Sequence, residues 1–150
     1  MNSSKIRKAV VGDEHAIIEL IKRLAEFEKA LNEVTNTAEN LRKDLFDEKA
    51  CESIVIEYDS KIVGFALYYT SYSTWKGQCL YLEDFYVLPE LRSLGLGSKL
   101  FDSVVDIAIK KGVKRMDWQV LDWNDGAIKF YQKKNAILDG EWINGRLFFD

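Results

Sequence analysis

Residues 78–101 constrain the fold of this chain most, because they read as a strand, a glycine turn and a helix in succession. The apolar and aromatic run from Leu80 to Leu88 predicts a strand, and Pro89 ends it because proline cannot donate to a strand ladder. Apolar residues recur at helical spacing from Ser98 onward. This order aims free backbone N–H groups and the positive end of a helix at the turn, where an anion can bind.

The spacing within the turn separates three kinds of phosphate site. The turn consists of Arg92, Ser93, Leu94, Gly95, Leu96, Gly97 and Ser98. A P-loop requires Gly-Lys-Ser/Thr, whereas Gly97 is followed by Ser98 and only then by Lys99. A dinucleotide fingerprint requires a third small residue where Leu100 stands. What remains is an Arg-x-x-Gly-x-Gly anion turn, or a glycine-rich turn that binds no ligand.

Composition places the chain among globular enzymes or binding domains rather than nucleic-acid proteins. Its 150 residues suit one domain, and the net charge of −3 fits a cationic small molecule better than a nucleic acid. We expect a cytoplasmic protein without a membrane segment, because no signal-peptide core or long apolar run is present. Cys51 and Cys79 have no companion ligand spacing, which predicts reduced thiols and no metal site.

The remaining pattern predicts an α/β domain spanning residues 1–150. Strands are expected at residues 6–11, 53–58, 62–69 and 113–121, besides the central strand. Helices are expected after Asp13, after Thr37, from Ser98 to Lys111, and through Tyr131. Asn144-Gly145 predicts a final hairpin. The result is a mixed sheet of about seven strands, antiparallel in its first half and flanked by four helices.

This order, with its glycine turn after the fourth strand, resembles the fold of the Gcn5-related N-acetyltransferases (GNAT). Four stretches, at residues 24–29, 72–77, 81–87 and 120–124, are together similar to the diamine (spermidine/spermine) acetyltransferase family. The Ser-Thr-Trp-Lys-Gly and Leu-Asp-Trp-Asn sequences within them resemble its thialysine-acetylating branch. The resemblance implies acetyl-CoA as co-substrate, a small-molecule amine as acceptor, and a homodimer.

The resemblance also implies how acetyl-CoA is held. Pyrophosphate would lie on the amides of residues 92–98, where Gly95 and Gly97 allow close approach because they carry no Cβ. A bulge near residues 85–87 would separate two strands and admit the pantetheine, and a backbone N–H there would stabilise the thioester oxyanion. The remaining cofactor contacts implied are Phe85, Tyr86, Val87, Asn124, Ala127 and Tyr131.

Glu83 and Asp84 are adjacent in an otherwise apolar strand, whose alternation predicts one carboxylate on each face of the sheet. A protonated amine is no nucleophile, so its proton must be accepted before attack. The resemblance implies that Glu83 assists this step and that Tyr131 protonates the leaving CoA thiolate. The alternatives are a carboxylate pair at a solvated strand end and a Tyr131 ring that only fills a core.

The acceptor contacts implied by the family are Phe27, Glu28, Trp75, Glu83, Asp84, Trp118 and Gln119. Polyamine enzymes have tyrosine at the position of Phe27 and aspartate at that of Ser73, so the case for a long polycation is weaker. We therefore expect thialysine, a lysine-like amino acid or a short diamine, with polyamines left open. Other acceptors, such as a protein N-terminus or an aminoglycoside, and a non-catalytic acyl-CoA-binding module remain alternatives.

Overall fold

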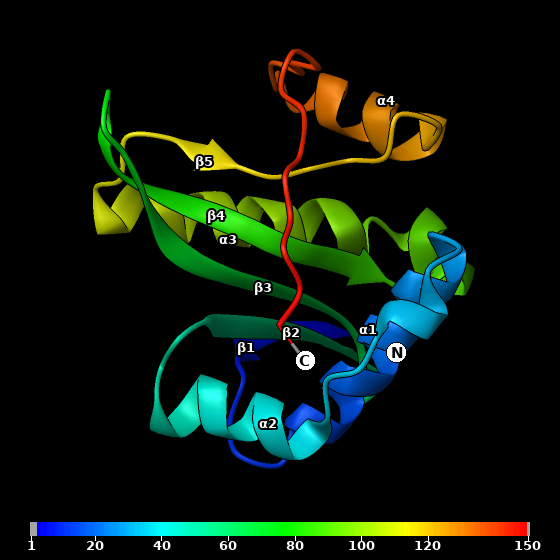
Figure 1. Cartoon of the computed structure of the whole chain (residues 1–150). Helices are drawn as coiled ribbons and strands as arrows, with labels where there is room; N and C mark the ends of the chain where they lie inside the picture. The colour runs from blue at the N-terminus through cyan, green and yellow to red at the C-terminus, as the bar shows by residue number, and fades with distance from the viewer. Residues whose placement is uncertain (1–2, 150) are drawn as a thin grey trace. The chain divides into compact units, whose positions relative to one another are not determined.

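The computed structural model describes residues 3–149 (Figure 1). The chain forms two compact units, residues 1–119 and residues 120–150. The first unit contains the whole sheet and the helices α1 (Glu14–Phe27), α2 (Ala38–Arg42) and α3 (Leu96–Lys111). The second contains helix α4 (Asp125–Lys133).

The sheet has the order β1-β2-β3-β4-β5. Its strands are β1 (Ser4–Lys8), β2 (Glu52–Tyr58), β3 (Lys61–Ser73), β4 (Gly77–Val87) and β5 (Met116–Asp117). The first three pairings are antiparallel and β4 pairs with β5 in parallel. The predicted mixed sheet with an antiparallel first half is therefore confirmed.

The prediction of about seven strands is wrong for the described residues, which form five. Residues 136–149 contain no strand, so the hairpin predicted at Asn144-Gly145 is absent there. A two-stranded hairpin is only marginally stable unless it joins a sheet or packs on a helix, and a local turn signal supplies neither. The strand predicted at residues 113–121 shrinks to the two residues of β5.

Helices cover both faces of the sheet in the first unit, with α1 and α2 on one face and α3 on the other (Figure 1). Their bounds are α1 (Glu14–Phe27), α2 (Ala38–Arg42), which continues as a π-helical turn (Lys43–Asp47), and α3 (Leu96–Lys111). The core beneath α1 and α2 contains Ile17, Leu20, Leu41, Leu45, Val55, Phe65, Leu67 and Tyr86. The inward face of α3 buries Leu96, Leu100, Phe101, Val104 and Ala108.

The sequence predicted caps for α1 and α2, and the two have different outcomes. Thr37 caps α2 as predicted, because its hydroxyl accepts from the N–H of Asn40 at 3.1 Å. Asp13 is the N-cap residue of α1 as predicted, but its carboxylate makes no capping bond to the helix and instead accepts from Arg7 at 2.7 Å and from the N–H of Val10 at 2.8 Å. A guanidinium within reach gives a stronger, charge-assisted bond than a backbone N–H.

Candidate functional site

A β-bulge at Glu83 organises the candidate site. In the ladder between β3 and β4, Leu67 is opposite Asp84 while Tyr68 is opposite Leu82, so Glu83 is an extra residue on β4. Such a bulge interrupts the ladder and re-aims nearby side chains. The bulge that the family resemblance implied near residues 85–87 is thus present slightly earlier in the strand.

The bulge interrupts the alternation that predicted Glu83 and Asp84 on opposite faces, and the register fixes the face of Asp84 alone. Tyr81 is paired with Tyr69 and Asp84 with Leu67. Tyr69 and Leu67 are two residues apart, so they share a face, and their partners Tyr81 and Asp84 share it as well. Leu67 belongs to the core beneath α1, so Asp84 lies on the α1 face of the sheet.

Three carboxylates act on one another at this point. Burial, followed by the charges of Glu83 and Glu28, raises the pKa of Asp84 from 3.8 to about 7. Burial also raises the pKa of Glu28, which directly follows α1. In the described part of the chain, none of the three forms an ion pair with a basic side chain. The cluster of Glu28, Glu83 and Asp84 is therefore an uncompensated negative site.

Two tyrosines border this carboxylate cluster, and sequence reasoning did not identify either. The rings of Tyr69 and Tyr81 lie 5.3 Å apart between centroids and are tilted by 32°. Burial and then the charge of Glu83 raise the pKa of both hydroxyls. Aromatic faces beside carboxylates favour a cation, so the arrangement suits an ammonium group. Tyr69 and Tyr81 are register partners on β3 and β4. This pairing is the signal that identifies them, and the sequence alone does not show it.

After Tyr81, β4 no longer pairs with β5 in the described residues. It pairs with β5 only at Leu80 and Tyr81, although it continues to Val87. The edge that includes Phe85, Tyr86 and Val87 therefore has no partner strand on the β5 side in residues 3–149. An unpaired edge presents backbone donors and acceptors in a row, to which an extended group can bind.

The turn after β4 follows the expected strand–turn–helix order, with a 3₁₀ segment (Pro89–Leu94) between Val87 and α3. Gly95 caps α3 in the left-handed region at φ 75°, which glycine adopts without strain. Helix α3 has no acidic residue in its first turn, so its positive end is not neutralised from within. Arg92, Ser93, Leu94 and Gly95 are exposed, Gly97 and Ser98 are half-buried, and Leu96 is buried.

Gly97 differs from Gly95 because the fold itself does not require it. A Cβ at Gly97 would meet only the ring of Phe85, at 3.9 Å, which is an ordinary contact. Gly97 also has no left-handed φ to satisfy. A substitution of Gly97 can therefore test whether a ligand approaches closely there without disturbing the fold.

The structure links several of the other predicted residues in pairs. The guanidinium of Arg92 lies 5.9 Å from the ring centroid of Phe27, so the end of α1 meets the segment before α3. Phe101 of α3 contacts both Phe85 and Trp118, at centroid distances of 5.6 Å and 5.5 Å. Trp118 thus joins an aromatic cluster on the α3 face and is not beside the carboxylates. Gln119 is exposed, and Trp75 lies in the β3–β4 turn with 84% of its surface exposed.

Residues predicted in the second unit have local roles there. Asn124 caps α4 through its side-chain oxygen, which accepts from the N–H of Ala127 at 3.2 Å. Tyr131 lies in α4, is buried, and makes an edge-to-face contact with Phe130 at 5.4 Å.

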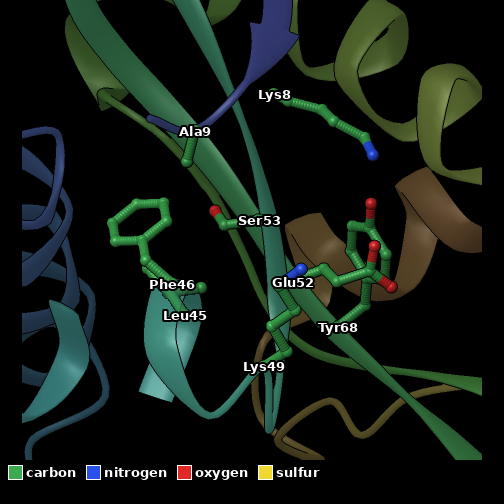
Figure 2. A pocket seen from close by; sticks show the side chains of 8 residues that line it. All are labelled: Lys8, Ala9, Leu45, Phe46, Lys49, Glu52, Ser53 and Tyr68. Atoms are coloured by element: carbon green, nitrogen blue, oxygen red, sulfur yellow. The ribbon is translucent and has the colours of Figure 1, made fainter. Parts of the chain in front are cut away.

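None of the predicted site residues lines the cavity of about 380 Å³ in the first unit (Figure 2). That cavity is lined by Lys8, Ala9, Leu45, Phe46, Lys49, Glu52, Ser53 and Tyr68. Within residues 3–149, no group of three or more His, Cys, Asp or Glu side chains could hold a metal ion. No described helix combines the length and apolar character needed to cross a membrane.

Comparison with known proteins agrees with this geometry. The model of the acetyltransferase (GNAT) family matches residues 17–136. A thialysine N-epsilon-acetyltransferase of Caenorhabditis elegans is 43% identical over 129 residues, covering 85% of this chain and 80% of the relative. The thialysine N-epsilon-acetyltransferase of Mus musculus is 40% identical over 158 aligned residues, covering 97% and 93%.

Solved structures show the same fold at lower identity. A crystal structure of an aminoglycoside acetyltransferase from an uncultured soil metagenomic sample, in complex with trehalose, has a TM-score of 0.80 and 21% identity. The match covers 98% of this chain and 97% of that one. Proteins of this family use acetyl-CoA as co-substrate. The chain therefore belongs to the GNAT acetyltransferase family, and it is an N-acetyltransferase.

Proposed function

We propose that this enzyme transfers the acetyl group of acetyl-CoA to a primary amine of a small molecule, namely thialysine, a lysine-like amino acid or a short diamine. The cluster of Glu28, Glu83 and Asp84 beside Tyr69 and Tyr81 carries the proposal, because it is acidic and aromatic and has no basic partner among residues 3–149. An ammonium group supplies the missing positive charge. The names of the relatives, thialysine N-epsilon-acetyltransferases, support this acceptor class.

Glu83 accepts the amine proton in this proposal, directly or through water. Its neighbour Asp84 has a pKa of about 7, so near neutral pH about half of the Asp84 carboxyl groups carry a proton. A carboxyl pair in that state can bind an ammonium ion and also take up its proton, as general-base catalysis near pH 7 requires. The deprotonated nitrogen then attacks the thioester carbonyl carbon.

Acetyl-CoA is held by main-chain groups. Its pyrophosphate binds the amides of residues 92–98 at the positive end of α3, with Arg92 adding charge. The pantetheine lies along the β4 edge that β5 leaves unpaired, and a backbone N–H of residues 85–87 donates to the carbonyl oxygen as it gains negative charge. Asn124, Ala127 and Tyr131 complete the cofactor site, as the family resemblance implies.

Tyr131 protonates the departing sulfur. As the new C–N bond forms, the C–S bond breaks and its electron pair leaves on CoA. The tyrosine hydroxyl gives its proton to that thiolate, and the second proton that the nitrogen loses on becoming an amide returns to the tyrosine, directly or through water. Replacing Tyr131 with Phe keeps the aromatic contact with Phe130 and removes only the hydroxyl. We expect Tyr131→Phe to keep its affinity for CoA and to lose about 10²-fold or more in kcat; unchanged kcat would remove this role.

The acceptor class is tested by steady-state rates with acetyl-CoA over a panel of thialysine, lysine, ornithine, putrescine, spermidine and spermine. We expect the highest kcat/KM among the amino acids and short diamines. A clear preference for spermine would contradict the proposal, because a long polycation needs carboxylates spaced along its whole length.

We further propose that residues 1–150 act as one acetyltransferase domain of a cytoplasmic homodimer. Tyr72 and Trp75, near and at the β3–β4 turn, expose 73% and 84% of their surface, and large exposed aromatic side chains are typical of interfaces. Sedimentation equilibrium tests the dimer directly. A monomer at all micromolar concentrations would contradict it.

A further inference from the structure

The α1 face of the sheet continues past the carboxylate cluster to a pair of opposite charges, Arg115 just before β5 and Asp117 on it. Asp117 is the register partner of Tyr81, and its charge adds to those that raise the pKa of the Tyr81 hydroxyl. Arg115, two residues earlier, contacts Asp117 through Nε, at 2.8 Å from Oδ1 and 2.9 Å from Oδ2. One face therefore presents, in sequence, acidic groups, two tyrosine rings and a zwitterionic pair.

The Arg115–Asp117 pair retains much of its binding capacity. Only Nε of the guanidinium is engaged, and no residue in the described range 3–149 accepts from Nη1 or Nη2 of Arg115. Those two nitrogens carry four N–H donors in the planar arrangement that matches a carboxylate. The Asp117 oxygens accept two contacts from Nε and have further lone pairs for an ammonium group. Arg115 is exposed and Asp117 half-buried, so both are accessible on this unit.

The distance between the two ends suits one acceptor length. Glu83 is two residues beyond Tyr81 on β4, and Asp117 is beside Tyr81 on β5, so their Cα atoms are about 8 Å apart. In an extended lysine-like amino acid, five bonds separate the distal nitrogen from the α-carbon, a span of about 6 Å. The two lengths are therefore of the same order, and the intervening methylene or thioether atoms would lie across the Tyr69 and Tyr81 rings.

Resting on the proposed function, we propose that Arg115 and Asp117 select an α-amino acid acceptor by binding its α-carboxylate and α-ammonium groups while its distal amine lies at Glu83 and Asp84. A diamine of the same length would place a second cation beside Arg115 and lose the carboxylate contact. The pair is thus a specificity determinant of the acceptor site and takes no part in the chemical step.

Three acceptors with the same reacting amine test the pair. Thialysine has both head groups, bis(2-aminoethyl) sulfide lacks the carboxylate, and 3-(2-aminoethylthio)propanoate lacks the α-amine. We expect Arg115→Gln to reduce kcat/KM for thialysine by about tenfold to a hundredfold, mainly through KM, with the sulfide diamine unchanged or improved. Asp117→Asn should reduce kcat/KM for thialysine more than for the propanoate.

Matched variants distinguish lost recognition of the charged groups of the acceptor from a general loss of activity. Lys114→Gln removes a neighbouring exposed charge and should leave the ratio between the acceptors unchanged, whereas Arg115→Lys should restore part of the thialysine activity. Equal effects of Arg115→Gln on thialysine and on the diamine would overturn the inference and leave the proposed function intact. Failure of the wild-type enzyme to acetylate any of the three would instead refute the proposed function, and the inference with it.

Discussion

Replacing Asp84 with Asn should stabilise the protein at neutral pH while harming its activity. The folded state raises the pKa of Asp84 from 3.8 to about 7, mainly through burial and then through the charges of Glu83 and Glu28. The folded protein therefore binds this proton more tightly than the unfolded chain does. Stability from this group is complete below pH 3.8 and is lost as the pH rises through 7.

The raised pKa corresponds to a loss of up to about 4 kcal/mol in the free energy of unfolding between pH 4 and pH 8, at about 1.4 kcal/mol for each tenfold change in proton affinity. Asparagine is nearly isosteric and never carries the charge. The difference in unfolding free energy between Asp84→Asn and the wild type should then be small near pH 4 and reach about 2 to 4 kcal/mol in favour of the variant at pH 8.

Urea denaturation at half-unit intervals from pH 4 to pH 8.5 measures this difference directly. Asp106→Asn is the matched control, because Asp106 is exposed on α3 and its replacement should leave the pH profile parallel to that of the wild type. Parallel profiles for Asp84→Asn and the wild type would refute the reasoning. They would mean that Asp84 is ionised at ordinary cost and that the cluster is not electrostatically strained.

Three further substitutions test the fold and the cofactor turn separately. Gly64→Ala should cost about 2 kcal/mol or more in thermal or urea unfolding, because its Cβ would come within 2.8 Å of the Tyr86 carbonyl oxygen; Gly126→Ala, with nothing within 4 Å, is the control, and equal stability of the two variants would contradict the packing. Gly97→Ala should leave the unfolding free energy unchanged or raise it by up to about 1 kcal/mol, yet weaken CoA binding in calorimetry by tenfold or more; unaltered binding would show that no ligand approaches there. Thr37→Ala should cost about 1 kcal/mol through loss of the α2 cap, and no change in the urea midpoint would contradict that role.

Periodicity and turn chemistry predicted most of the first unit. The strand–turn–helix stretch from β4 to α3 is confirmed, as is the antiparallel pairing of β2 with β3. These features depend on residues close together in sequence. The predicted order of elements from β1 to α4 is therefore confirmed, whereas the hairpin predicted at Asn144-Gly145 is not.

The site required long-range information. Alternation assigned Glu83 and Asp84 to opposite faces, but the register against β3 inserts a bulge, and no local pattern in β4 marks it. Tyr69 read as an ordinary strand aromatic, and only its pairing with Tyr81 brings it beside the carboxylates. The side-chain capping bond of Asp13 is absent for a similar reason, since the competing guanidinium of Arg7 comes from a neighbouring element.

The central claim is that a small amine is bound and deprotonated at the bulge on β4. The most direct test is the initial rate of CoA release at saturating acetyl-CoA and increasing concentrations of thialysine, measured for the wild type and for Glu83→Gln. We expect turnover that saturates in thialysine and a loss of about 10²-fold or more in kcat/KM for Glu83→Gln. Equal rates for the two proteins would contradict it.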